Sequence, residues 1–226
     1  MMGIGVTFVI PVLNEAGNIG PLLHRLKASY PTSECVVVDG GSTDGTVVEA
    51  RREQATVHCS VSGRAVQMNA GARLATKPYL FFLHADTLPS ISDTQLQAHL
   101  RTQPQWGFFE VQLSGSPWLL RVVERAMNMR SRLSRVATGD QMIFVRRELF
   151  EKTGGYKPIP LMEDVEYCKR LRHIAAPMVV SHAVETSSRR WERQGVVSTV
   201  VQMWCLRLAY FLGISPARLK NYYRNA

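Results

Sequence analysis

The stretch Leu80–Pro89, LFFLHADTLP, decides the fold that the sequence predicts. Its first half, Leu80–Leu83, is typical of a strand buried on both faces, and Pro89 prevents further strand pairing. Burial explains the apolar residues but gives no reason for His84 and Asp86 just beyond them. In open α/β sheets, ligands bind outside the carboxyl ends of the strands, so a carboxylate here could face a polyphosphate–metal complex. Asp86 could equally cap the next turn or helix, and this stretch alone leaves both interpretations open.

The composition indicates one globular domain with an excess of positive charge. The 226 residues can bury a substantial core, and 46% hydrophobic with 20% charged residues is unlike a disordered chain. A net charge of +9 indicates an anionic partner, such as nucleic acid, anionic lipid or a phosphorylated substrate. The scattered cysteines show no metal-ligand spacing, and Met1–Leu13 has no basic leader, so we expect a reduced, cytoplasmic compartment.

Two further strands precede the central stretch. Val6–Val12 and Glu34–Asp39 are short apolar runs, and Asn18 between them is a candidate N-cap for a helix through about Ala28. Gly40–Thr46 then turns into another helix. This alternation of strands and helices predicts an α/β fold with a mostly parallel sheet.

Asp39 closes its strand at the same sheet edge as Asp86. A carboxylate there can accept hydrogen bonds from a ribose or a base, but Asp39 and Ser42 could also simply hold the turn. The turn lacks both the Gly-x-Gly-x-x-Gly fingerprint and the Gly-Lys-Ser/Thr phosphate loop. These absences argue against a dinucleotide-binding dehydrogenase and a P-loop ATPase.

Arg64 stands at the start of a predicted helix of small residues, Gly63–Ala72. The helix dipole does not favour a cation there, so a nearby anion would explain the arginine better. The alternative is an ordinary solvated surface arginine.

The second half of the chain contains two helices of uncertain environment. Pro117–Val136 interleaves apolar residues with Arg121, Arg125 and Arg132, so its basic face could meet anionic lipid or only water. Gly195–Leu212 has an uncharged run of about twelve residues, below the roughly twenty that span a bilayer. It is either a core helix or an interfacial one.

Three acids of the second half are candidate functional residues. Asp140 enters from a loop, where a buried carboxylate needs a partner: the surroundings of a metal, an acceptor hydroxyl or an arginine. Glu163 and Asp164 begin a helix that runs through about Leu171, and their position suits the helix dipole without any further role.

At this point the chain resembles the family-2 glycosyltransferases, which have the GT-A fold. Five segments match in order: Val9–Glu15, Val36–Asp44, Arg64 with Asn69–Gly71, His84–Asp86 and Met162–Asp164. A narrower likeness, through Gly139–Gln141, Phe144–Arg147 and Gly154–Tyr156, is to a bacterial subgroup described as radical-SAM and selenium-domain-associated transferases.

The resemblance implies roles for individual residues. Asp39 would contact the nucleotide base, with Arg64 near the nucleotide. Asp86 would bind Mn²⁺ or Mg²⁺ together with the diphosphate. The residues that would line the nucleotide sugar also include Pro11, Leu13, Glu15, His84, Ala85 and Asp140. His84 replaces the first Asp of the family's Asp-x-Asp motif and could still donate to a phosphate or a ribose.

The acid pair Glu163 and Asp164 would lie beside the reacting sugar, with Asp164 as general base. We therefore expect a metal-dependent inverting transferase with a nucleoside-diphosphate sugar donor, UDP-type favoured and GDP or dTDP as alternatives. Its acceptor is an unidentified hydroxyl, and no nucleic acid partner is expected. An anionic membrane surface, at the inner face of the plasma membrane, is a candidate partner.

The expected organisation is a GT-A domain at residues 1–190, with a nucleotide-binding half (1–90) and an acceptor half (91–190). Residues 191–226 would be a helical extension, core-packed or membrane-interfacial. Three rival functions remain. A nucleic-acid binder would explain the net charge of +9, but its basic residues should interleave with exposed aromatic residues, and strand-end carboxylates would repel phosphate without a metal. A nucleotidyltransferase should have a Gly-rich basic phosphate loop where this chain has Asn14–Asn18, and a non-catalytic sugar-nucleotide-binding protein would bind without turnover.

Overall fold

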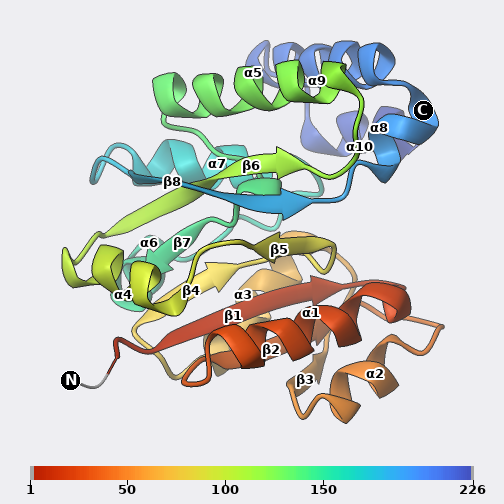
Figure 1. Cartoon of the computed structure of the whole chain (residues 1–226). Helices are drawn as coiled ribbons and strands as arrows, with labels where there is room; N and C mark the ends of the chain where they lie inside the picture. Colours follow the sequence, from red (N-terminus) through yellow and green to blue (C-terminus); the bar gives the residue numbers. More distant parts are fainter. Residues whose placement is uncertain (1–2, 225–226) are drawn as a thin grey trace.

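The structure, a computed structural model, describes residues 3–224 and contains one curled sheet flanked by helices (Figure 1). The strands follow the order β3-β2-β1-β4-β7-β6-β8-β5 across the sheet. In chain order they are β1 (Val6–Val12), β2 (Glu34–Asp39), β3 (Thr56–Cys59), β4 (Tyr79–Phe82), β5 (Thr87–Pro89), β6 (Trp106–Leu113), β7 (Phe144–Arg146) and β8 (Met178–Thr186).

The helices connect these strands and continue beyond the last of them. They are α1 (Ala16–Ser29), α2 (Thr46–Arg52), α3 (Arg64–Leu74), α4 (Asp93–Arg101), α5 (Trp118–Ser134), the 3-10 turn η1 (Gly139–Gln141), α6 (Arg147–Thr153), α7 (Glu163–Leu171), α8 (Arg189–Gln194), α9 (Val196–Phe211) and α10 (Pro216–Arg224).

The sheet is α/β as predicted, but it is mixed, and only its first part is parallel throughout. Strands β3, β2, β1 and β4 pair in parallel. The short strand β7 then pairs antiparallel with both β4 and β6, and β5 pairs antiparallel with β8. These pairings join segments far apart in the chain, which local patterns do not encode.

The predicted cap of α1 is wrong. The helix begins at Ala16, and Asn18 lies inside it, where its Nδ2 donates to Glu15 Oε2 at 2.6 Å. The reason lies in the neighbouring loop: Glu15 N donates to Thr46 Oγ1 and Ala16 N donates to Asp44 Oδ2. The first backbone donors are therefore satisfied from outside the helix, and no side chain of its own has to cap it.

The core occupies both faces of the sheet, as the sequence predicts for the central stretch. Phe81 packs on one face under α1 and α4, where its ring stacks on Phe144 at 5.1 Å. Leu80 and Phe82 point to the other face, under α3, α6 and α7. All of Leu80–Leu83 is at most 3% exposed. The polar residues that follow therefore emerge from a rigid, buried strand.

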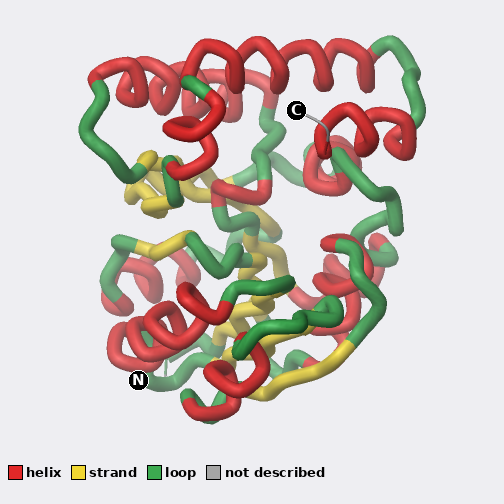
Figure 2. Tube along the Cα trace, turned by 90° about the vertical axis from the view of Figure 1, so that its right-hand side faces the viewer, coloured by secondary structure: helices red, strands yellow, loops and turns green. Residues whose placement is uncertain are grey.

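Helix α9 lies over the part of the sheet formed by β6 and β8 and runs beside α5 (Figures 1 and 2). Leu206 of α9 and Leu219 of α10 pack against Met162 and Val165, which attaches this region to α7. Most of the apolar face predicted for α9 is nevertheless exposed, including Trp204. Within residues 3–224, no helix combines the length and the hydropathy needed to cross a bilayer.

Gly107 in β6 is the tightest point of the sheet and gives a stability prediction. A Cβ added there would lie 2.2 Å from the Met178 carbonyl oxygen and 2.5 Å from the Phe144 ring. We expect Gly107→Ala to lower the free energy of unfolding by about 3 kcal/mol, because a backbone carbonyl in a ladder cannot move aside. Urea unfolding measures this effect.

Gly17→Ala is the matched control, since a Cβ at Gly17 in α1 meets no atom within 4 Å. It should leave stability unchanged or raise it by up to about 1 kcal/mol. Equal midpoints for the two variants would show that β6 and β8 adjust freely at Gly107.

Candidate active site

A cavity of about 420 Å³ lies at the carboxyl ends of β1, β4 and β8. Eight of the predicted site residues line it: Pro11, Leu13, Glu15, Arg64, His84, Ala85, Asp86 and Asp140. They come from four separate segments of the chain. The structure therefore brings together most of the residues that the sequence singles out for the nucleotide sugar.

The loops after β1 and β2 are cross-bonded beside this cavity, where Asn14 and Asp44 line a neighbouring cavity that shares Glu15 and Asp86 with it. Asn14 N donates to Ser42 Oγ at 2.8 Å, and Thr43 N donates back to Asn14 Oδ1 at 2.9 Å. Asn14 adopts a left-handed conformation (φ 57°), which asparagine tolerates better than most residues. Neither loop can move without the other.

Asp39 holds the turn that follows β2. It is 3% exposed, and its Oδ2 accepts hydrogen bonds from Gly41 N and Ser42 N, both at 3.0 Å. It is absent from the residues that line the 420 Å³ cavity. Its contacts are those of the turn-holding alternative, and its contact with a base stays a prediction.

Asp86 does not cap the following helix. Helix α4 has its own capping box, in which Ser92 accepts from Gln95 N and Gln95 accepts from Ser92 N. The Asp86 side chain is paired only with Thr87 Oγ1, at 3.5 Å, among the contacts of the described residues. Its carboxylate therefore lines the cavity with most of its accepting capacity unused.

His84 joins the end of β4 to the turn η1. Its Nδ1 lies 3.5 Å from Asp140 Oδ1, and the ring packs so closely on Gly139 that a Cβ there would lie 2.6 Å from Nε2. Histidine was not among the partners expected for Asp140. The contact joins the first half of the chain to the second at the cavity.

The acid pair lies in a smaller cavity of about 70 Å³, next to the first. Glu163 and Asp164 line only this smaller cavity, whereas Arg64 and Asp140 line both. Loss of solvation in the site lowers the pKa of Arg64. The negative charges of Glu163 and the other nearby acids have a larger opposite effect, so the pKa of Arg64 is raised. The anion that Arg64 faces here is thus supplied by the protein itself.

Both acids of the pair have raised pKa values. For Asp164, burial is the main cause and Asp140 adds to it, although hydrogen bonds from Gly139 N (2.8 Å) and Val165 N (2.7 Å) favour the ionised form. For Glu163, burial and then the charge of Asp164 raise the pKa. Two adjacent carboxyls with raised pKa values in a cleft are typical of acid–base sites.

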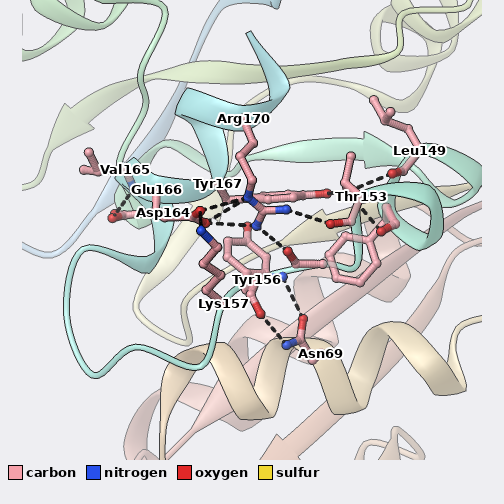
Figure 3. A network of polar contacts seen from close by, with 12 residues as sticks. Asn69, Leu149, Thr153, Tyr156, Lys157, Asp164, Val165, Glu166, Tyr167 and Arg170 are labelled. Atoms are coloured by element: carbon pink, nitrogen blue, oxygen red, sulfur yellow. Dashed lines mark hydrogen bonds and ion pairs between the residues drawn. The ribbon is translucent and has the colours of Figure 1, made fainter. Parts of the chain in front are cut away.

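A polar network behind α7 fixes the acid pair relative to α3 (Figure 3). Glu166 accepts from Arg170 Nε at 2.9 Å and pairs with Lys157 Nζ at 2.8 Å. Asn69 of α3 exchanges two hydrogen bonds with the backbone of Tyr156, at 2.7 and 2.9 Å. The loop between α6 and α7 is therefore tied to both helices.

Several lining residues were missed by the sequence analysis: Ser62, Gly63, Gln67, Thr186, Ser187, Trp191, Thr199, Met203 and Tyr223. Gln67 ties β1 to β2, because its Nε2 donates to the carbonyls of Val12 and Val38. Its place in a helix of small residues was a usable signal. Thr199, Met203 and Tyr223 belong to the predicted extension 191–226, and nothing in their local pattern indicates that they return to the site.

The donor set suits a hard cation that arrives with its substrate. Among the described residues, no group of three His, Cys, Asp or Glu side chains could hold a metal ion by itself. Mg²⁺ and similar ions are often held by one or two carboxylates together with substrate phosphates and water. Asp86, one of three carboxylates that line the cavity with Glu15 and Asp140, fits that kind of site.

The family comparison agrees with this geometry. Residues 7–105 match the model of glycosyl transferase family 2. The likeness to this family thus covers the first half of the β-sheet region and less than half of the chain. An uncharacterized glycosyltransferase of Mycobacterium tuberculosis is 32% identical to it over 143 residues, 58% of this chain and 62% of the relative. Dodecaprenyl-phosphate galacturonate synthase of Rhizobium johnstonii is 45% identical over 51 residues, 21% of this chain and 15% of the relative. The chain thus spans less than two thirds of these relatives.

Solved structures confirm the GT-A fold. A mannosyltransferase from Pyrobaculum calidifontis, in complex with GDP-Man and Mn²⁺, has a TM-score of 0.61 at 21% identity, over 83% of this chain and 57% of its own. Glucosyl-3-phosphoglycerate synthase from M. tuberculosis, with Mn²⁺ and UDP, has a TM-score of 0.58 at 19% identity, over 94% and 81%.

Proposed function

We propose that the chain transfers a sugar from a nucleoside-diphosphate sugar to an acceptor hydroxyl, with inversion at the anomeric carbon. The observation that carries the proposal is the pair of adjoining cavities. One is lined by Arg64 and Asp86 at the strand ends, and the other by the acids Glu163 and Asp164. Donor and acceptor would meet where the two cavities share Arg64 and Asp140.

The donor would lie in the larger cavity, against Pro11, Leu13 and Glu15, with its base toward Asp39. A UDP-type donor is favoured, with GDP and dTDP as alternatives. Of the similar solved structures, one holds UDP and another GDP-Man. Asp86 would hold Mn²⁺ or Mg²⁺ with the diphosphate. When bound, the ion supplies positive charge that neutralises the leaving diphosphate.

In the transfer step, the acceptor oxygen bonds to the anomeric carbon on the face opposite the leaving group. The bond from that carbon to the diphosphate oxygen breaks, and its electron pair leaves with the nucleoside diphosphate. Asp164 takes the proton of the acceptor hydroxyl, and Glu163 orients the acceptor. Each Asp164 oxygen accepts one backbone N–H, and each has a further lone pair for this proton.

The raised pKa of Asp164 predicts the pH dependence. The base must be ionised, so turnover should fall as the pH drops through its pKa, and this acid limb should lie above the 3.8 of an ordinary aspartate. Asp140→Asn should move the limb to lower pH, because the charge of Asp140 contributes to raising that pKa. Profiles of kcat against pH for both proteins measure this. A limb at the ordinary value would argue that another group is the base.

Labelled UDP-, GDP- and dTDP-sugars, with Mn²⁺ or with EDTA, test the proposed function. A transferase should release the nucleoside diphosphate, through slow hydrolysis even without acceptor, and only with the metal. Release of pyrophosphate from nucleoside triphosphates and sugar phosphates would instead indicate a nucleotidyltransferase. Metal-dependent binding with no turnover on any acceptor would leave a sugar-nucleotide-binding protein.

Attachment to an anionic membrane surface is part of the proposal. Arg125 on α5 and the apolar residues of α9 are exposed on neighbouring helices. Arg121 and Arg132 contribute less than the sequence suggests, because they pair with Glu124 at 2.9 Å and with Glu110 at 2.7 Å. The attraction would thus be more apolar than electrostatic.

A further inference from the structure

An apolar groove of about 330 Å³ lies between α5 and α9, the two helices that run side by side in Figures 1 and 2. Its walls include Leu119, Val122, Val123, Val197, Val200 and Trp204. Val197 is 65% exposed and Trp204 is 71% exposed, so the mouth of the groove is open to solvent. A channel of this character is suited to an apolar chain.

The inner end of the groove reaches the candidate active site. Met203 and Asp140 line the groove and both cavities of the site, and Arg207 lines the groove and the acid-pair cavity. A molecule lying in the groove would therefore present one end to Glu163 and Asp164. The groove thus borders both cavities of the site, and Arg207 connects it to the cavity of the acid pair.

Two guanidinium groups at this inner end have unused donors. The Nε atoms of Arg130 and Arg207 are buried and have no hydrogen-bond partner among the described residues. Arg130 uses its Nη2 to donate to Ser131 Oγ at 3.1 Å. Asp140, the acid among the lining residues, lies against His84. Buried donors without partners are costly, and a ligand anion would satisfy both.

We propose that the groove binds the apolar chain of the acceptor, and that Arg130 and Arg207 bind a phosphate in its head group. The acceptor is then a membrane phospholipid whose head carries a hydroxyl beside the phosphate. This inference rests on the proposed transferase function and names its acceptor class. A second copy of this chain fits the groove less well, because two chains of net charge +9 repel each other.

Vesicle binding by the full chain tests the apolar part, with phosphatidylglycerol as the anionic, hydroxyl-bearing lipid and phosphatidylcholine as the neutral one. Trp204→Gln should weaken binding to phosphatidylglycerol vesicles about tenfold, because Trp204 would lose its contact with the chain. Trp118→Gln is the matched control: Trp118 is 74% exposed on α5 but does not line the groove. Equal losses in both variants would overturn the proposal. So would a dimer, seen by sedimentation, that Trp204→Gln abolishes.

The phosphate part is tested with a second pair. Arg207→Gln should reduce the preference for phosphatidylglycerol about fivefold, even at 0.5 M salt, where exposed charges are screened. Arg125→Gln is the matched control. It removes an exposed charge of α5, so any effect on the preference for phosphatidylglycerol should vanish at 0.5 M salt. If Arg207→Gln leaves the preference unchanged while remaining folded, the assignment of Arg207 is wrong.

Calorimetric binding of UDP with Mn²⁺ separates this inference from the function on which it rests. If the unmodified chain binds UDP but shows no preference for phosphatidylglycerol over phosphatidylcholine, only the proposal of a lipid acceptor is overturned. Absence of UDP, GDP and dTDP binding in a chain that still binds lipid would overturn the transferase function. If Trp204→Gln does not fold, Val197→Gln repeats the vesicle-binding test at another exposed residue of the groove. Leu133→Gln is its control, because Leu133 is exposed but does not line the groove.

Discussion

Replacement of Asp164 by asparagine is expected to lower turnover by roughly 10²–10⁴-fold, the usual contribution of a general base. The asparagine oxygen can still accept from Gly139 N, so the link between η1 and α7 should largely persist. Donor affinity should stay within about threefold, since Asp164 does not line the nucleotide cavity. Steady-state kinetics with a donor and acceptor pair, beside calorimetry with the nucleoside diphosphate, measure the two quantities.

Glu163→Gln is the natural comparison, because the two acids are adjacent and their side chains diverge by about 100° on the helix. It should reduce turnover less than Asp164→Asn does. The reverse order would assign the base to Glu163. Near-normal turnover in both variants would move the base to Asp140, the remaining acid that lines the small cavity.

Asp86→Asn is expected to remove the metal-dependent part of nucleoside-diphosphate binding. The loss should exceed the 10–100-fold that outer-shell partners of metals typically contribute, because Asp86 would be the direct protein ligand. Its effect on folding should be small, since among the described residues the side chain has a single weak contact, to Thr87. Titration of UDP in Mn²⁺ and in EDTA gives the metal-dependent part by difference.

Asp93→Asn controls for the removal of a charge elsewhere, because Asp93 lies in the first turn of α4 and lines none of the cavities at the site. His84→Asp restores the usual Asp-x-Asp motif and should retain metal binding. If Asp86→Asn binds UDP with unchanged metal-dependent affinity, Asp86 is not a ligand of the metal. Loss of metal binding in His84→Asp would show that His84 has a role of its own, through its contact with Asp140.

Elements with local signals were predicted well. Strands β1 and β2 have the predicted ends. The start of α1 was wrong because its first donors are satisfied by Thr46 and Asp44 of another loop. The mixed character of the sheet escaped prediction for the same reason: β7 pairs with strands about 40 or more residues before it in the chain.

In the candidate site, too, residues with a local signal could be predicted and residues brought in by distant segments could not. Asp86 and His84 could be singled out because burial could not explain polar residues directly after a buried strand. The neighbours of the acid pair could not be predicted from the sequence. Tyr223 and Met203 reach the site only through the packing of α9 and α10. The contact of His84 with Asp140 depends equally on the tertiary fold, because it joins residues more than fifty positions apart.

The cross-bonded loops after β1 and β2 have a consequence for the thermodynamics of binding. Because Asn14 and Asp44 already hold these loops to each other, the backbone beside the proposed nucleotide cavity is ordered before a nucleotide binds. Little conformational entropy is then lost on that side when the donor binds. The acceptor side is built from separate helices, so ordering on binding should be concentrated there. Heat capacity and hydrogen exchange should therefore change more for α5 and α9 than for the loops at Asn14 and Asp44.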